Sequence, residues 1–231
     1  MKKICTIIQI IISVIALTFA SVAGLVFIKG STDNLTPLSQ GYRNRSQVMI
    51  HNDIKYGRGI IVNETDEYID IVTAKHIVDT IDDEAGLIVE TSDKKEIPAE
   101  LVYQFKNMDS AVVRIQKSDS DAFIPHPVIS YYLDEDEYYS ITPGTPVYYL
   151  DGIYDDDFSL SEGIWSDGST FIVELGIIAG VFNGSVRPGM SGEGVYTEDG
   201  SWVGMIIAAS DKEGAFIPAH EIMKNYDIYV R

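Results

Sequence analysis

Residues 187–196 read Arg-Pro-Gly-Met-Ser-Gly-Glu-Gly-Val-Tyr, and this stretch carries more information about the fold than any other part of the chain. Ser191 lies between Gly189 and Gly192, so the backbone around its hydroxyl is free to adopt a tight turn that other residues would resist. A G-x-S-G sequence is common by chance. Its meaning therefore depends on the segments that come before it.

Two earlier segments place a histidine and an aspartate at the ends of strand-like runs. Residues 71–78, IVTAKHIV, end a β-branched run in small residues and then present His76. Residues 107–115, NMDSAVVRI, place Asp109 directly before an alternating strand pattern. Taken singly, each residue has an ordinary structural interpretation. Together with Ser191, in this order and each at a strand end, they favour a catalytic group.

The body of the chain predicts an all-β fold. Short runs rich in β-branched and aromatic residues alternate with turn signals, and no long stretch has the 3.6-residue period of a helix. The expected strands are residues 47–51, 59–63, 68–73, 86–91, 97–104, 111–116, 146–151, 170–175, 194–197, 202–208 and 215–218. A short helix is expected over residues 219–225. Such a series of short strands is typical of a barrel or a sandwich.

The first thirty residues differ from the body. Residues 4–28 carry no charge, and a helix of this length spans a hydrocarbon core of about 30 Å. Lys2 and Lys3 precede it, which predicts a cytoplasmic N-terminus and an extracytoplasmic body. A cleaved secretory signal is the alternative, because residues 21–23 offer small side chains for cleavage. The expected domains are a transmembrane anchor or signal segment at 1–29, a linker at 30–45 and one domain at 46–231.

Charge and cysteine content exclude several classes of function. The 231 residues include 17 Lys and Arg against 35 Asp and Glu, a net charge of −18, so no nucleic-acid partner is expected. Cys5 is the only cysteine, which excludes an intrachain disulfide and a thiolate metal site. We expect no cofactor and no metal. The acidic clusters at 134–137 and 155–157 lie among Gly, Pro and Tyr residues and are expected to be solvated loops. A weak calcium site is the alternative, and the absence of EF-hand spacing argues against it.

The three segments resemble the motifs of the trypsin-like (chymotrypsin-fold) serine peptidases, nearest to the bacterial HtrA and V8-like branch. TAKHIV, MDSAVVRI and RPGMSGEGVYTEDGSWVGMI are similar to the histidine, aspartate and serine motifs of that family, and GAFIPAHEI resembles its last strand and C-terminal helix. The resemblance covers residues 45–225. It implies two six-stranded antiparallel β-barrels with the site in the cleft between them, followed by a short C-terminal helix.

The resemblance also implies a role for each motif residue. Ser191 would attack the scissile carbonyl, His76 would take its proton, and Asp109 would hold the imidazole. The backbone N–H groups of Gly189 and Ser191 would form the oxyanion hole. The residues expected to line the primary specificity pocket are Ser185, Val186, Ile207, Ala208 and Ala209. None of these is charged, which predicts a preference for small or medium apolar residues at the cleaved position.

Several positions depart from the family pattern. Met190 stands where the digestive members carry an acid that receives a newly cut N-terminus, so activation by N-terminal insertion is not expected. Glu193 replaces a glycine and is expected to point to solvent. The histidines at His51, His126 and His220 match no motif and are expected to be structural or on the surface. The chain continues for only 40 residues after the predicted nucleophile, so no PDZ domain is expected.

The sequence therefore predicts a membrane-anchored, extracytoplasmic serine endopeptidase that acts on proteins or peptides and is secreted if its N-terminal segment is cleaved. The alternative is a catalytically inactive binding or scaffold domain of the same fold at the cell surface. The complete set of three candidate residues argues against this alternative. A serine esterase is disfavoured, because the serine motif is not the G-x-S-x-G nucleophile elbow.

Overall fold

The computed structural model describes residues 46–52, 54–79, 86–91, 94–119, 128–129, 131–151, 159–210 and 212–231. All of these belong to the second of the two units into which the chain divides, residues 1–36 and 37–231. The predicted span, the linker, His126 and the acidic cluster at 155–157 lie outside the described residues. Within those described, no helix is both long enough and apolar enough to cross a membrane.

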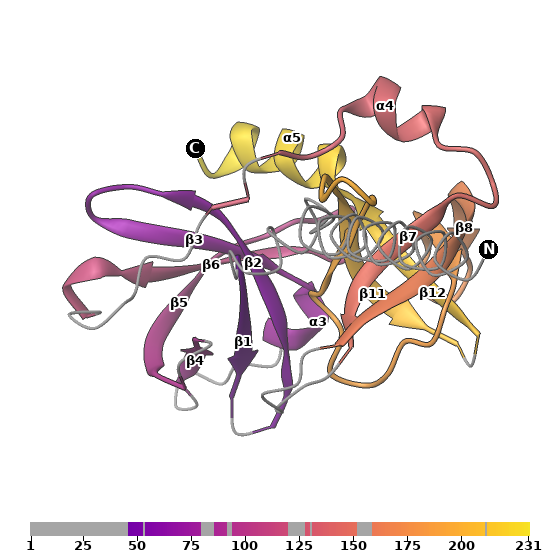
Figure 1. The fold of residues 1–231 in the computed structure, drawn as a ribbon. Coiled ribbons are helices and arrows are strands. Elements are labelled where there is room, and N and C mark those ends of the chain that lie inside the picture. The colour runs from indigo at the N-terminus through magenta and orange to yellow at the C-terminus, as the bar shows by residue number, and fades with distance from the viewer. Residues whose placement is uncertain are drawn as a thin grey trace, which may run out of the picture. The chain divides into compact units, whose positions relative to one another are not determined.

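The described strands form two closed antiparallel barrels of six strands each (Figure 1). The first barrel has the order β1-β2-β3-β6-β5-β4 and comprises β1 (Gln47–His51), β2 (Tyr56–Glu64), β3 (Tyr68–Thr73), β4 (Leu87–Glu90), β5 (Glu96–Gln104) and β6 (Ala111–Gln116). The second has the order β10-β11-β12-β9-β8-β7 and comprises β7 (Pro146–Asp151), β8 (Ser159–Ile172), β9 (Ile177–Asn183), β10 (Gly194–Tyr196), β11 (Trp202–Ala209) and β12 (Glu213–Pro218).

Short helices lie between the strands or after the last of them. They are α3 (Lys75–Val78), α4 (Glu135–Ser140) and α5 (Ala219–Tyr229), with a 3-10 turn at Lys117–Asp119. The two barrels and the C-terminal helix α5 confirm the architecture predicted from the sequence. The barrels also share a core, because the aliphatic cluster inside the first barrel continues through Trp202 and Met205 of β11 to α5. Aromatic side chains such as Phe182 and Phe216 fill the second barrel.

The strand predicted over residues 170–175 is right for residues 170–172 and wrong for residues 173–175. Residues 173–176 form a turn, in which Gly176 has a φ of +67°, and the preceding strand β8 extends back to Ser159. The register of β8 against β9 shifts between Trp165 and Asp167, and again between Asp167 and Thr170. These bulges break the apolar–polar alternation that identifies a strand in a sequence.

The acidic cluster at residues 134–137 is also not the loop that the sequence predicted. Asp134 is the N-cap of α4: its Oδ1 accepts the backbone N–H of Glu137 at 2.9 Å, and Glu137 Oε2 accepts the N–H of Asp134 at 3.1 Å. This reciprocal arrangement is a capping box, and carboxylates in the first turn also suit the helix dipole. Tyr138 is fully buried and anchors the helix on the second barrel. The cluster therefore has a structural role.

A buried aspartate attaches α5 to the first barrel. Asp70 in β3 is fully buried, and it accepts hydrogen bonds from Arg114 Nε at 2.6 Å, from Arg114 Nη2 at 2.9 Å and from the hydroxyl of Tyr226 at 2.7 Å. The hydrogen bond to Asp70 raises the pKa of Arg114. Burial, followed by the same carboxylate, raises the pKa of Tyr226. The helix, seen along the top of Figure 1, is thus held by both packing and charge.

Replacing Tyr226 with Phe should lower the free energy of unfolding by about 1.5–3 kcal/mol, because the buried Asp70 carboxylate loses a hydrogen bond. Urea denaturation of the purified chain measures this cost. Tyr229→Phe is the matched control on the same helix: Tyr229 is 56% exposed, so its cost should stay within about 0.5 kcal/mol. Equal costs for the two variants would contradict a special role for the Asp70 contact.

Candidate active site

His76 lies on the short helix α3, just after β3 ends. Ile77 and Val78 on the same helix are buried and hold it against the first barrel, whereas the imidazole of His76 remains 39% exposed. Its backbone N–H donates to Asp109 Oδ1 at 3.0 Å, and its Nδ1 lies 2.6 Å from Asp109 Oδ2. One carboxylate therefore holds both the main chain and the ring of His76.

This contact determines what the imidazole can do. Asp109 is largely buried, and it lies between the buried residues Met108 and Ser110 just before β6. A carboxylate that accepts the Nδ1–H leaves Nε2 unprotonated and directed away from Asp109. Because the ring is partly exposed, Nε2 is the nitrogen that can accept a proton from a nucleophile.

Ser191 lies in the loop before β10. Gly189 and Gly192 both have a φ of +90°, a conformation that glycine adopts without strain. The N–H of Met190 donates to Arg187 O at 3.2 Å, but among the described residues no acceptor takes the N–H of Gly189 or of Ser191. Two backbone donors beside a serine hydroxyl are what an oxyanion hole requires.

Met190 anchors the serine loop in the second barrel. Its side chain is fully buried in the aromatic core of the second barrel. Its sulfur also lies 3.2 Å from the backbone N–H of Arg187, which donates to it. Apolar packing therefore fixes the residue between the two candidate oxyanion donors.

The backbone of β2 connects the serine loop to the histidine. The N–H of Arg58 donates to Ser191 O at 2.7 Å, and the carbonyl of Arg58 accepts the hydroxyl of Thr73, at the end of β3, at 2.7 Å. Gly57 permits this approach, since a Cβ there would lie 2.8 Å from both Ser191 O and Ile77 Cγ1. The described structure has no hydrogen bond between the Ser191 hydroxyl and His76, which is common before a substrate binds.

Glu193 does not point to solvent as predicted. It is fully buried and forms an ion pair with Arg58, whose side chain is 3% exposed. Burial raises the pKa of the Glu193 carboxyl, and the charge of Arg58 opposes that shift. The sequence prediction failed because the partner lies 135 residues earlier, in the other barrel. The pair crosses the barrel interface two residues after the candidate nucleophile.

The residues predicted to line the specificity pocket are spread over different environments. Ile207 is buried in the shared core, Val186 packs against the aromatic cluster, and the carbonyl of Ser185 accepts the hydroxyl of Tyr149 at 3.1 Å. Ala208 is half-buried and Ala209 is exposed. A cavity of about 630 Å³ that opens to solvent is lined by Asn183, Ser210, Lys212 and Glu213. Ser210 directly follows Ala209 in the sequence.

The remaining histidines have separate environments. His220 is partly buried, its ring centroid lies 4.9 Å from that of Tyr138, and burial lowers its pKa. This agrees with the structural role expected for it. His51 lines a surface cavity on the first barrel.

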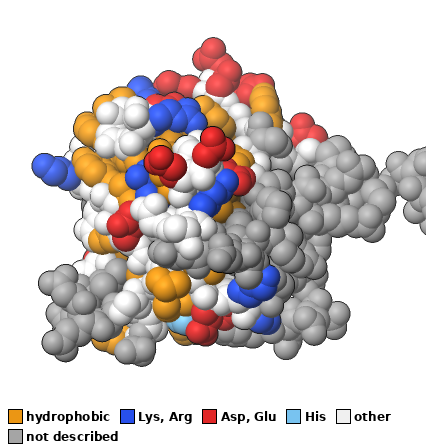
Figure 2. Space-filling model, turned by 90° about the vertical axis from the view of Figure 1, so that its left-hand side faces the viewer, with side chains coloured by type: hydrophobic (Ala, Val, Ile, Leu, Met, Phe, Trp, Pro, Cys, Tyr) orange, Lys and Arg blue, Asp and Glu red, His pale blue; other side chains and the backbone are white. Residues whose placement is uncertain are grey.

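On the face drawn in Figure 2, basic and acidic side chains are interspersed and the basic ones do not gather into one surface.

Comparisons with known proteins agree with the fold. The family described as trypsin-like peptidase domain matches residues 57–205. No curated protein matches the chain. A serine-to-alanine mutant of Rv3671c from M. tuberculosis H37Rv, in an inactive form, has a TM-score of 0.62 at 15% identity, covering 86% of this chain and 93% of that one. The Rv3671c protease, also in an inactive form, has a TM-score of 0.59 at 16% identity, covering 81% and 90%.

Replacing Gly192 with Ala should be much more costly than replacing Gly176 with Ala. Both glycines have positive φ, but a Cβ at Gly192 would lie 1.7 Å from Arg58 O, whereas nothing lies within 4 Å of one at Gly176. The left-handed conformation alone costs about 1–2 kcal/mol, which is the full expectation for Gly176→Ala. Urea denaturation of the two variants compares the costs, and equal values would show that the barrels do not approach so closely.

Replacing Glu193 with Leu should lower the free energy of unfolding by about 3–5 kcal/mol, because Arg58 is left buried without a counter-charge. Adding Arg58→Met removes that unpaired charge. The double variant should therefore recover about 2 kcal/mol or more of the loss. Unfolding curves for both single variants and the double variant complete the cycle, and costs that simply add would rule out the ion pair.

Proposed function

The chain belongs to the trypsin-like peptidase family, and we propose that it is a serine endopeptidase that hydrolyses peptide bonds through Ser191, His76 and Asp109. The observation that carries this proposal is the 2.6 Å contact between His76 Nδ1 and Asp109 Oδ2, beside the loop that holds Ser191. A structural histidine would not need a buried carboxylate on Nδ1 together with an exposed ring. The arrangement suits a base that takes a proton and is then stabilised as a cation.

The chemistry proceeds through an acyl-enzyme. Ser191 Oγ attacks the scissile carbonyl carbon while His76 Nε2 takes the hydroxyl proton, and Asp109 stabilises the resulting imidazolium. The protonated His76 then gives its proton to the leaving amine as the C–N bond breaks. Water, activated by the same imidazole, attacks the ester and releases the acid, which regenerates the Ser191 hydroxyl.

The unused N–H groups of Gly189 and Ser191 would stabilise the oxyanion that forms during both attacks. Each such donor contributes about 2.7–4 kcal/mol to the transition state. Both belong to the loop whose Met190 is fixed in the core of the second barrel. The donors would thus keep their directions without rearrangement when substrate binds.

We also propose that the peptidase works outside the cytoplasm, attached to the membrane. The uncharged residues 4–28 with Lys2 and Lys3 before them support an anchor with the body on the outer side. Residues 30–45 would then serve as the tether. The substrates are proteins or peptides, and the neutral side chains predicted from the sequence to line the pocket, such as Val186 and Ala208, favour a small or medium apolar side chain at the cleaved position.

Membranes from cells that express the full chain should react with a fluorophosphonate probe, because an activated serine displaces fluoride from phosphorus to give a stable phosphonyl ester. Ser191→Ala should abolish labelling, and His76→Ala should slow it by at least about 100-fold. The labelled band should stay with the membrane after a carbonate wash. A gel of the labelled fractions measures all three outcomes.

Ser169→Ala is the matched control, since it removes an exposed hydroxyl on β8 that belongs to neither the triad nor the predicted specificity pocket. Labelling that survives Ser191→Ala would contradict the assignment of the nucleophile. A native chain that is folded but never labels would instead support the inactive scaffold. A labelled band that washes off the membrane would contradict the anchor and leave the peptidase assignment intact.

A further inference from the structure

Three side chains that can bind a metal ion lie on the outer face of the first barrel, apart from the triad. In β1 the residues Val48 and Ile50 are buried, which leaves His51 on the outer face. Glu90 and Glu96 occupy the corresponding outer positions of β4 and β5. Glu90 pairs directly with Glu96 across the sheet, and with Met49, two residues before His51. The sheet register therefore places one imidazole and two carboxylates together.

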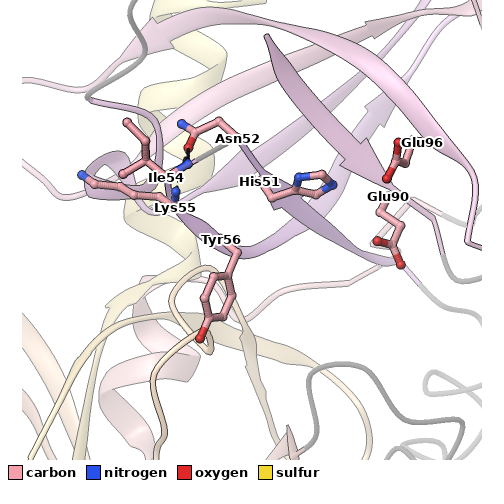
Figure 3. Close-up of a pocket in the computed structure, with 7 residues that line it drawn as sticks. All are labelled: His51, Asn52, Ile54, Lys55, Tyr56, Glu90 and Glu96. Carbon is pink, nitrogen blue, oxygen red and sulfur yellow. Dashed lines mark hydrogen bonds between the residues drawn. The ribbon is translucent and has the colours of Figure 1, made fainter. Parts of the chain in front are cut away.

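Their ligand atoms are close to one another. One nitrogen of His51 and one oxygen from each of Glu90 and Glu96 all lie within 4.8 Å of one another. The three side chains border a surface cavity of about 350 Å³. In Figure 3 the imidazole of His51 points toward Glu90 and Glu96, and Asn52, Ile54 and Lys55 lie on its other side.

We propose that His51, Glu90 and Glu96 bind a divalent transition-metal ion. Around a zinc ion with ligands at about 2.1 Å, neighbouring ligand atoms lie about 3.4 Å apart, so small rotations of the side chains would close the site. One imidazole with two carboxylates suits zinc and its neighbours in the first transition series, whereas calcium and magnesium prefer all-oxygen sites. Open space in the cavity leaves a fourth position for water.

The charge of the cluster also calls for a cation. Two carboxylates directly opposite each other on adjacent strands destabilise a sheet unless something compensates them. Lys94 provides part of this compensation, because its Nζ lies 3.3 Å from Glu90 Oε1. The Lys94 side chain is 55% exposed, against 13% for Glu90, so the lysine compensates this charge from the solvent side only.

The site lies at the start of a segment that supports the candidate base. Asn52, next to His51, accepts the backbone N–H groups of Ile54 and Lys55 at 2.8 Å and 2.7 Å. Lys55 Nζ in turn donates to the carbonyl of His76 at 2.6 Å. An ion at His51 would therefore stiffen the β1–β2 turn, and its binding would stabilise the folded chain.

Zinc binding to the full-length chain in detergent, after treatment with a chelator that is then removed, tests the proposal. Isothermal titration calorimetry should give one zinc ion per chain with micromolar affinity. Saturating zinc should raise Tm by about 5 °C or more. Cobalt should give visible absorption bands that belong to a nitrogen- and oxygen-bound ion.

His51→Gln and Glu96→Gln should each weaken zinc binding by at least about tenfold and remove the Tm shift. Both side chains are on the barrel surface, and the two variants should match the native Tm in chelator. Glu100→Gln, an exposed carboxylate on the same strand, and His76→Gln, in the triad, should both retain the site. A native chain without zinc binding, or zinc binding that both His51→Gln and Glu96→Gln leave unchanged, would overturn the proposal.

Discussion

The buried ion pair between Arg58 and Glu193 is the constraint on which the arrangement of the site depends. Each charge would cost several kcal/mol to bury alone, so the two barrels can close over them only when they meet. Arg58 is on β2 and Glu193 follows Ser191 by two residues, so the requirement to pair these charges also sets the position of the serine loop. If the two barrels packed together in another position, both buried charges would lose their partner.

Hydrogen bonds and a glycine make that position precise. The N–H of Arg58 binds Ser191 O, and its carbonyl binds Thr73, three residues before His76. Arg58 therefore contacts both motifs. Its N–H and its side chain bind the serine loop, and its carbonyl binds Thr73 in the segment before His76. Gly192 lets the loop come this close, because any Cβ there would overlap the Arg58 carbonyl. The close contact between the two barrels thus requires the second glycine of the G-x-S-G sequence, Gly192, as does the turn around Ser191.

The sequence predicted the barrels because many of their strands either alternate between buried and half-buried residues, as β1 does, or are buried along nearly their whole length, as β3 is. It failed at β8, where bulges break the alternation, and at residues 134–137, where a capping box turns an acidic run into a helix start. His76, Asp109 and Ser191 were predicted from three local motifs, and the structure brings His76 and Asp109 into contact. Glu193 was misjudged because its environment is set by Arg58, and no local pattern in either segment indicates that contact.

The serine loop is fixed from three directions by groups that belong to the folded domain. Met190 fills the core of the second barrel, the N–H of Gly192 binds Ile206 O at 2.8 Å, and Arg58 of the first barrel holds Ser191 O. None of these contacts involves a chain terminus, or an acidic side chain that must pair with a newly cut N-terminus. The geometry of the loop therefore follows from the packing of the two barrels, through contacts that belong to the folded domain.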